Sequence, residues 1–175
     1  MRALETERLL LRTWRPGDAD FIFDLYSRIE VRRYLGTTAS VMQERDEAVK
    51  LLERWSELAH PIHHIWAITL KDDERPVGVL LLKPIPASGT DGAPSGDTEI
   101  GWHLHPDAWG NGYASEAARR VLDVAFEAGL DRVVAVTNPE NVASQAVCRR
   151  IGMTHLGQTE LYYDTVCELF EARRS

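Results

Sequence analysis

Residues 98–122, "TEIGWHLHPDAWGNGYASEAARRVL", hold the pattern that decides the fold. In the first seven residues, apolar side chains alternate with others, which is typical of a strand with one buried face. From Ala114 to Ala125 the apolar residues recur at helical spacing, so we expect an amphipathic helix that ends at Gly129. The turn "GNG" (110–112) joins strand to helix. It predicts an anion site, because the first N–H groups of a helix are unpaired and glycine allows close approach.

The glycine turn by itself leaves its ligand open. A nucleotide-hydrolysing P-loop requires Gly-Lys-Ser/Thr, whereas Tyr113 and Ala114 follow Gly112. A dinucleotide fingerprint requires a third glycine, which "GNGYAS" (110–115) lacks. Two interpretations remain: a phosphate-bearing ligand of another class, or a tight turn that needs glycine only for its backbone shape.

The segments around this stretch predict a mixed α/β sheet. We expect strands at residues 8–14, 64–70, 77–85, 98–104, 132–137, 154–161 and 165–171. We expect further helices at residues 19–27, 31–35, 42–59 and 142–151, the first with Asp18 as N-cap and the last between the N-cap Asn141 and the stop Gly152. The two strands within 64–85 read as an antiparallel hairpin. Residues 84–97, with three prolines and three glycines, read as a flexible loop.

Bulk composition narrows the classes of function. A chain of 175 residues is the length of one ordinary domain, and its net charge of −7 argues against nucleic acid as a partner. The excess of acidic residues could favour a cationic substrate, or could simply keep the protein soluble. No apolar run approaches the roughly 20 residues that span a membrane, and we see no signal pattern at the N-terminus. Cys148 and Cys167 lack zinc-finger spacing, so we expect free thiols in a reducing cytoplasm.

The chain resembles the Gcn5-related N-acetyltransferase (GNAT) superfamily, and within it the RimJ/RimL-like, ribosomal-protein N-acetyltransferase type. "WGNGYA" (109–114) matches the acyl-CoA signature Gln/Arg-x-x-Gly-x-Gly/Ala at Gly112 and Ala114, with Trp109 at the position where Gln or Arg is usual. "EIGWHLHPDAWGNGYASEA" (99–117) resembles the strand, loop and helix of that branch. The branch's opening and its "Asn-x-x-Ser…Gly-Phe" segment are matched at residues 6–20 and 138–157. The resemblance covers nearly the whole chain, and implies one GNAT domain over residues 1–175.

This resemblance implies a sheet that splays between the strands at 98–104 and 132–137, with acetyl-CoA as co-substrate. The pantetheine arm would lie in the gap and hydrogen-bond main-chain groups of Trp102, His103 and Leu104, much like an added strand. Asn141 would face the cofactor from the last helix. The pyrophosphate would lie on Trp109, Gly110, Asn111, Gly112, Tyr113, Ala114 and Ser115. Among these, the Trp109 and Tyr113 side chains would pack beside the cofactor.

Amine acetylation requires a neutral amine and a path for its proton. Glu99 is our first candidate for that path, because it shares a strand face with Gly101 and His103 near the expected reacting carbon. The alternative for Glu99 is an ion-paired strand carboxylate. His103 is a second candidate base, with a hydrogen-bonded strand histidine as its alternative. Deprotonation at pH 7 costs about 1.4 kcal/mol for an α-amine of pKa about 8, but about 4.6 kcal/mol for lysine.

The leaving thiolate requires a proton donor. Many GNAT enzymes use a tyrosine in a "YEKxGF"-like segment, whereas the corresponding run here, "CRRIGM" (148–153), has Cys148 at that position. The resemblance therefore favours Ser144, the position that the ribosomal-protein branch uses. The alternative for Ser144 is a first-turn serine that bonds the backbone. Cys148 could donate a proton, or could be a small buried hydrophobic residue.

Acceptor, metal and assembly are less constrained. The acceptor could be a protein N-terminus or a small amine, amino acid or antibiotic, and a non-catalytic acyl-CoA-binding protein of the same fold stays open. A homodimer would be ordinary for the family. Five of the six histidines lie at 60, 63, 64, 103 and 105, but no carboxylate spacing supports a metal site, so we expect none. We also expect no membrane partner.

Overall fold

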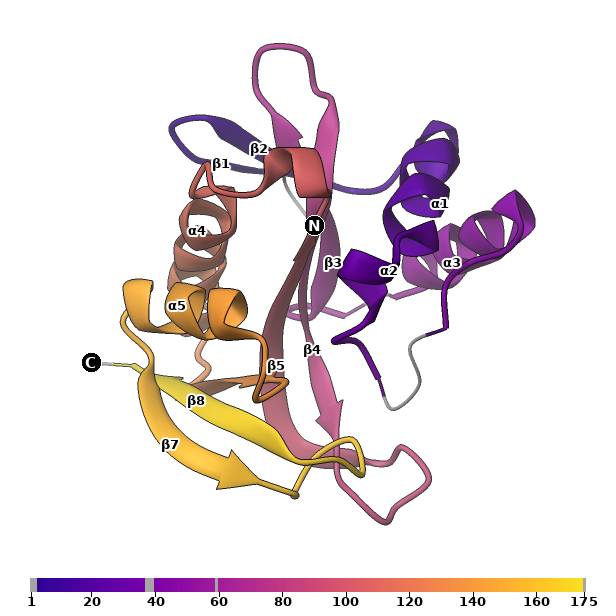
Figure 1. Cartoon of the computed structure of the whole chain (residues 1–175). Coiled ribbons are helices and arrows are strands. Elements are labelled where there is room, and N and C mark those ends of the chain that lie inside the picture. Colours follow the sequence, from indigo (N-terminus) through magenta and orange to yellow (C-terminus); the bar gives the residue numbers. More distant parts are fainter. Residues whose placement is uncertain (1–2, 37–39, 59, 175) are drawn as a thin grey trace.

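The computed structural model describes residues 3–36, 40–58 and 60–174. Within them, eight strands form one sheet in the order β1-β2-β3-β4-β5-β6-β8-β7 (Figure 1). The strands are β1 (Leu4–Glu5), β2 (Leu9–Arg12), β3 (His64–Leu70), β4 (Pro76–Pro86), β5 (Pro94–Leu104), β6 (Arg132–Thr137), β7 (Thr154–Thr159) and β8 (Cys167–Arg173). The α-helices are α1 (Ala19–Ser27), α2 (Ile29–Arg32), α3 (Arg45–Ser56), α4 (Tyr113–Glu127) and α5 (Val142–Arg150), with short 3₁₀ turns η1 (Pro16–Asp18) and η2 (Pro106–Ala108).

The sheet is antiparallel except where β5 meets β6. These two strands are parallel and pair at a single position, Glu99 opposite Val134. Beyond that pair β5 and β6 diverge, which confirms the splayed sheet. The β3–β4 hairpin and the two closing strands β7 and β8 are also present as expected.

Helices cover both faces of the sheet (Figure 1). The face that packs on α4 carries β-strand residues such as Leu80 and Leu82, while their neighbour Val79 points into the cluster under α1 and α3. This alternation follows from the two-residue period of a strand. The six apolar α4 positions that set its helical spacing are all buried: Ala114, Ala117, Ala118, Val121, Leu122 and Ala125.

The expectation of a flexible loop at 84–97 is wrong in its extent. Strand β4 continues to Pro86 and β5 begins at Pro94, with these two residues paired, so that only 87–93 connects the strands. The register shifts between Pro84 and Pro86. Such an irregularity lets a hairpin include prolines, which cannot donate to the ladder.

Asp18 precedes α1 but does not cap it with its side chain. Its carboxylate instead accepts hydrogen bonds from the Arg12 guanidinium, at 2.8 and 2.9 Å, and from the Arg15 N–H, at 2.8 Å. Burial opposes the charged form of Asp18, but these hydrogen bonds outweigh it and the pKa of Asp18 is lowered. A buried guanidinium requires such a partner, because an unpaired buried charge is costly.

Two helix boundaries also differ from expectation. Helix α3 begins at Arg45 rather than Met42, because the Glu47 carboxylate accepts the main-chain N–H groups of Gln43 and Glu44 and starts the helix there. Its expected end, Ala59, lies outside the described residues. The helix expected at 31–35 is α2, which starts at Ile29 directly after the extended Arg28. No helix in the described part of the chain is long and apolar enough to cross a membrane.

Candidate functional site

A cavity of about 350 Å³ opens where β5 and β6 diverge. Its closed end is at the Glu99–Val134 pair. Strand β5 contributes Glu99 to His103, and strand β6 contributes Ala135 to Thr137. The remaining walls include Asn141 and Ser144 at the start of α5, and Tyr163 and Cys167 from the β7–β8 hairpin. The volume is in the range of small-molecule sites.

The open edge of β5 offers main-chain groups to this cavity. The His105 N–H donates to the Val77 carbonyl at 3.0 Å, and bonded positions alternate along an antiparallel ladder. Counting back along the ladder, His103 bonds β4, whereas Trp102 and Leu104 direct their main-chain groups towards the gap. The Leu104 carbonyl accepts the Trp109 indole N–H at 2.9 Å. His103 therefore reaches the cavity with its side chain.

Thr137 supplies a polar atom that fits a ligand with amide groups. Its hydroxyl is buried and has no hydrogen-bond partner among the described residues, although Thr137 lines the cavity. A buried hydroxyl without a partner costs free energy. The amides of a pantetheine arm would supply the missing partner, so the wall of β6 fits the acyl-CoA expected from the sequence.

The glycine turn has the geometry of an anion site. Gly110 and Gly112 have φ of +78° and +80°, the left-handed region that favours glycine. The first helical hydrogen bond of α4 runs from the Glu116 N–H to the Gly112 carbonyl at 3.0 Å. The N–H groups of Tyr113, Ala114 and Ser115 therefore precede the helical ladder and point towards the turn.

Two residues of the expected phosphate site have structural partners of their own. The Asn111 side-chain amide donates to the carbonyls of Ala108 and Trp109, at 3.2 and 3.1 Å, so it orders the turn. The Ser115 hydroxyl accepts a hydrogen bond from Arg150 at 3.2 Å. Trp109 is about half exposed beside the turn.

Two arginines that the sequence did not single out lie at the turn. Arg150 reaches Ser115 from α5. Arg8 lies with its guanidinium 4.9 Å from the centre of the Tyr113 ring and pairs with Glu116 at 2.7 Å. No spacing pattern connects residues 8 or 150 to the turn, because only the fold brings them there.

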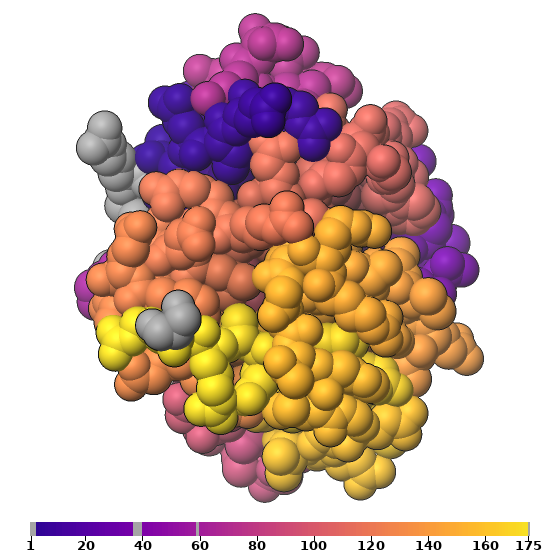
Figure 2. All heavy atoms as spheres, turned by 90° about the vertical axis from the view of Figure 1, so that its left-hand side faces the viewer, coloured from indigo at the N-terminus to yellow at the C-terminus, as the bar shows by residue number. Residues whose placement is uncertain are grey.

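Glu116 holds the N-terminal segment against α4. Its carboxylate accepts the Thr6 hydroxyl at 2.6 Å and the Arg8 N–H at 2.9 Å. Burial works against the charged form, but the hydrogen bonds from Thr6 and Arg8 lower the pKa of Glu116 below its ordinary value. Figure 2 shows the N-terminal segment (indigo) packed directly on the α4 region. Glu116 thus anchors the frame of the glycine turn, besides its place in the first turn of the helix.

Glu99 lies in a network of three side chains at the closed end of the cavity. It is buried, with 7% of its surface exposed, and accepts a hydrogen bond from the Tyr163 hydroxyl. The Lys83 ammonium is 3.2 Å from the same carboxylate and donates to the Tyr163 oxygen at 2.6 Å. Burial and the charge of Glu99 raise the pKa of Tyr163. Glu99 is therefore an ion-paired carboxylate that also faces the cavity.

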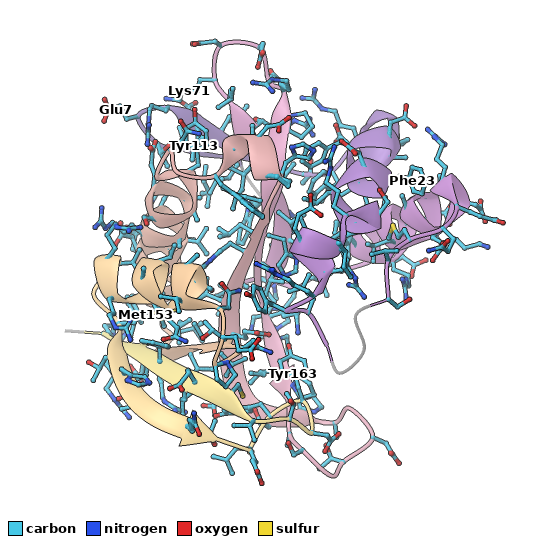
Figure 3. The ribbon with its side chains drawn as sticks, in the orientation of Figure 1. Glu7, Phe23, Lys71, Tyr113, Met153 and Tyr163 are labelled. Atoms are coloured by element: carbon cyan, nitrogen blue, oxygen red, sulfur yellow. The ribbon has the colours of Figure 1, made fainter. Side chains whose placement is uncertain are left out.

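Tyr163 and Lys83 are site residues that the sequence pattern missed. Lys83 is directly opposite Glu99 in the β4–β5 ladder, so the hairpin register could have identified it. Tyr163 lies in the β7–β8 turn with φ of +60°, where no periodic pattern applies. Figure 3 shows Tyr163 near the β7–β8 turn and Tyr113 at the start of α4, towards opposite ends of the site.

His103 separates this cavity from a second one. The second cavity has a volume of about 510 Å³, lies among α1, α2 and α3, and shares Leu35, Gly36 and His103 with the first. His103 Nδ1 is 2.7 Å from the Tyr26 hydroxyl. Burial, with the charges of Arg32 and Lys83, lowers the pKa of His103 to about 4, so the ring is neutral at pH 7.

The start of α5 places Asn141 and Ser144 on the cavity wall. The Asn141 side-chain oxygen accepts the Ser144 N–H at 3.1 Å, which confirms Asn141 as the N-cap. Cys148 is instead fully buried in the main core, and burial raises the pKa of its thiol to about 12. Cys148 is thus a small core residue and not part of the cavity.

The histidines do not gather around a common point. His60 stacks on His63 at 4.0 Å, and His63 contacts the Thr98 hydroxyl at 3.0 Å. His105 pairs with Asp24 at 3.0 Å. In the described ranges, no group of three or more His, Cys, Asp or Glu side chains could hold a metal ion.

Known proteins share this architecture. A family model described as an acetyltransferase (GNAT) domain matches residues 8–154. The chain is 30% identical over 161 residues to the uncharacterized N-acetyltransferase YoaA of Bacillus subtilis (strain 168), covering 91% of this chain and 86% of that protein.

Solved structures are similar in fold at low identity. A GNAT-family acetyltransferase from Bacillus anthracis has a TM-score of 0.76 at 23% identity, covering 97% of this chain and 96% of that one. RimL, a ribosomal L7/L12 alpha-N-protein acetyltransferase solved in complex with coenzyme A, has a TM-score of 0.79 at 18% identity, covering 98% of both chains. These two likenesses support the fold.

Proposed function

The chain belongs to the GNAT acetyltransferase family, and we propose that it transfers the acetyl group of acetyl-CoA to a primary amine by direct attack on the thioester. One observation carries this proposal. The cavity between β5 and β6 has a carboxylate, Glu99, at its closed end, and β5 leads from it to a glycine turn suited to phosphates. An acyl-CoA has the matching order of reactive thioester, amide-bearing arm and pyrophosphate.

We propose that the acyl-CoA arm runs along the open edge of β5. The main chain of Trp102 and the Thr137 hydroxyl would hydrogen-bond its amides. The N–H groups of residues 110–115 would hold the pyrophosphate, with Arg8 and Arg150 beside them. Acetyl-CoA would supply the acetyl group as a thioester.

Glu99 would receive the amine proton, directly or through water, as nitrogen bonds to the acetyl carbon and the carbon–sulfur bond breaks. Lys83 and Tyr163 would hold the carboxylate in place. Ser144 would donate a proton to the leaving thiolate and take one in turn from solvent water. An α-amine of pKa about 8 is neutral in about a tenth of molecules at pH 7, so it needs only this weak assistance.

A protein N-terminal α-amine is the first candidate acceptor. The resemblance of residues 138–157 to the RimJ/RimL-like branch and the fold likeness to RimL support it. A small amine is the second candidate, supported by the second cavity of about 510 Å³ beside His103. We further propose that residues 1–175 form one domain, and that the protein works in a reducing compartment such as the cytoplasm, which suits its two free, buried cysteines.

The test is a turnover screen with purified protein and acetyl-CoA. A pool of peptides and a pool of small amines are incubated separately, CoA release is measured, and acetylated products are identified by mass spectrometry. We expect products in one pool. Tight acetyl-CoA binding without turnover on any amine, together with Glu99→Gln and Ser144→Ala variants indistinguishable from wild type, would instead identify a non-catalytic acyl-CoA-binding protein.

A further inference from the structure

The wall of the second cavity is partly apolar and partly cationic. Helices α1, α2 and α3 and the segment before α3 enclose it, and it shares His103 with the acyl-CoA cavity. One part of the wall is apolar: Leu35, Val41, Met42, Leu51 and Trp55. The polar part includes Tyr26, Arg32, Glu47 and Arg54. Its volume of about 510 Å³ suits a compound of amino-acid or dipeptide size.

Arg32 is held in position on the wall. Its Nε donates to the Ser40 carbonyl at 2.6 Å, and its guanidinium lies 5.8 Å from the centre of the Tyr26 ring. Its charge helps to lower the pKa of His103, which faces the acyl-CoA cavity. The positive potential of Arg32 therefore extends to the wall that the two cavities share at His103.

Glu47, the carboxylate in the lining, does not neutralise the charges of both Arg32 and Arg54. Glu47 accepts the N–H groups of Gln43 and Glu44, at 2.7 and 3.0 Å, and so is committed to the start of α3. Within the described ranges, neither Arg32 nor Arg54 forms a salt bridge with a carboxylate. A cationic cavity in a chain of net charge −7 is a local exception to the acidic balance of the protein.

We propose that the acceptor carries an anionic group, a carboxylate or a phosphate, which Arg32 and Arg54 bind while its amine extends past His103 into the acyl-CoA cavity, from which its proton reaches Glu99 directly or through water. This inference rests on the proposed function and names the chemistry of its acceptor. Guanidinium groups suit carboxylates and phosphates because they donate in a planar fork. The apolar wall indicates that the acceptor also carries an aliphatic or aromatic group.

The anionic group of the acceptor could belong to an amino acid, to a phosphate ester or to an acidic side chain near a peptide N-terminus. A separate pair of substrates tests each of these three sources. Leucine against leucinamide tests an amino-acid carboxylate, and phosphoethanolamine against ethanolamine tests a phosphate. The dipeptide amides Met-Asp-NH₂ and Met-Asn-NH₂ test an acidic side chain near a peptide N-terminus. In at least one pair we expect kcat/KM for the anionic member to exceed that of its neutral counterpart by about tenfold or more.

Variants then assign that preference to the cavity. Arg32→Gln and Arg54→Gln should each lower kcat/KM for the anionic member by about 10- to 100-fold, with little change for the neutral one and for the KM of acetyl-CoA. Arg33→Gln is the matched control, because Arg33 follows Arg32 directly, stacks on Tyr34 and does not line either cavity. It should leave both substrates unchanged. Arg54 is exposed, so its variant is expected to fold even if Arg32→Gln does not.

A binding measurement tests this inference independently of the proposed function. Calorimetry of each amine pair with the protein in the presence of CoA measures charge preference without turnover. Equal affinities for the charged and neutral members of every pair, or equal losses for both members in Arg54→Gln, would overturn the anionic acceptor. Absence of CoA release with every amine would overturn the acetyltransferase proposal, while the binding ratio would still decide the preference for charge.

Discussion

The two cavities that meet at His103 are built from different parts of the chain. The acyl-CoA cavity depends on main-chain groups: the open edge of β5, a glycine turn and the start of a helix. The cavity among α1, α2 and α3 depends on side chains that come from several helices and a connecting segment. A main-chain site is determined by a few residues with special backbone shapes, whereas a side-chain site can change with each substitution. We therefore expect the first to define the family's co-substrate and the second to define this protein's acceptor.

Among the variants that test this contrast, we expect Gly112→Asp to have the largest effect. Gly112 has φ of +80°, and a Cβ there would lie 3.6 Å from the Arg8 guanidinium. The new carboxylate would pair with Arg8 and repel the pyrophosphate, so acetyl-CoA affinity should fall by about 100-fold or more by calorimetry. Gly112→Ala carries the same backbone strain without charge and should lose much less. Equal affinity in Gly112→Asp and wild type would refute the phosphate assignment.

Glu99→Gln tests the closed end of the acyl-CoA cavity. Removing the proton acceptor should reduce kcat by about 100-fold, because general base catalysis contributes on that order. Acetyl-CoA affinity should change little, since the glycine turn is untouched. Tyr163→Phe, which removes the hydrogen bond to Glu99 and the one from Lys83, should reduce kcat by a smaller factor. Wild-type turnover in Glu99→Gln would remove Glu99 from the chemistry.

The pH dependence of stability probes His103 between the cavities. Its pKa of about 4 lies below the ordinary value, so the unfolded chain takes up the proton first as the pH falls. The contribution of His103 is fully present above about pH 6.5 and is lost as the pH falls towards 4. Because the ring is partly exposed to the cavities, we expect a loss of about 1–2 kcal/mol between pH 7 and pH 5. Chemical denaturation of His103→Gln should show a correspondingly flatter profile, and an unchanged profile would contradict the assignment.

The smallest expected effect comes from Thr137→Val. Replacing a buried hydroxyl that lacks a partner should stabilise the unliganded protein by about 1 kcal/mol, yet weaken acetyl-CoA binding several-fold. Thr69→Val is the matched control, because the Thr69 hydroxyl donates to the Leu10 carbonyl at 2.8 Å. That variant should be destabilised and bind acetyl-CoA normally. Tighter binding by Thr137→Val would show that the ligand does not use this hydroxyl.

The same contrast explains how much could be predicted from sequence. Alternation on β5 and helical spacing on α4 are local, so both elements and the face that carries Glu99 were identified correctly. The prolines at 84, 86 and 94 suggested a loop, but a bulged hairpin includes them. Asp18 is a residue type that is typical of an N-cap, but the fold places it against Arg12, which takes its carboxylate instead.

Apart from Lys83, the missed site residues share one cause. Arg8 and Arg150 reach the glycine turn, Tyr163 reaches Glu99, and Arg32 lines the second cavity, each from a segment far along the chain. Their positions depend on how elements pack, and a pattern along the sequence does not encode packing. Cys148 shows the converse: it occupies the position of a functional tyrosine in the motif but is buried in the core.

The single pair between β5 and β6 also gives the sheet a mechanical property. Strands β1 to β5 form one block and β6 to β8 another, and along the sheet the blocks meet at Glu99 and Val134. We expect any rotation of one block against the other to pivot at this junction. Such a rotation would displace Leu104 and Thr137, at the far ends of the diverging strands, more than Glu99. The gap could then widen for the cofactor while Glu99 stays opposite Lys83.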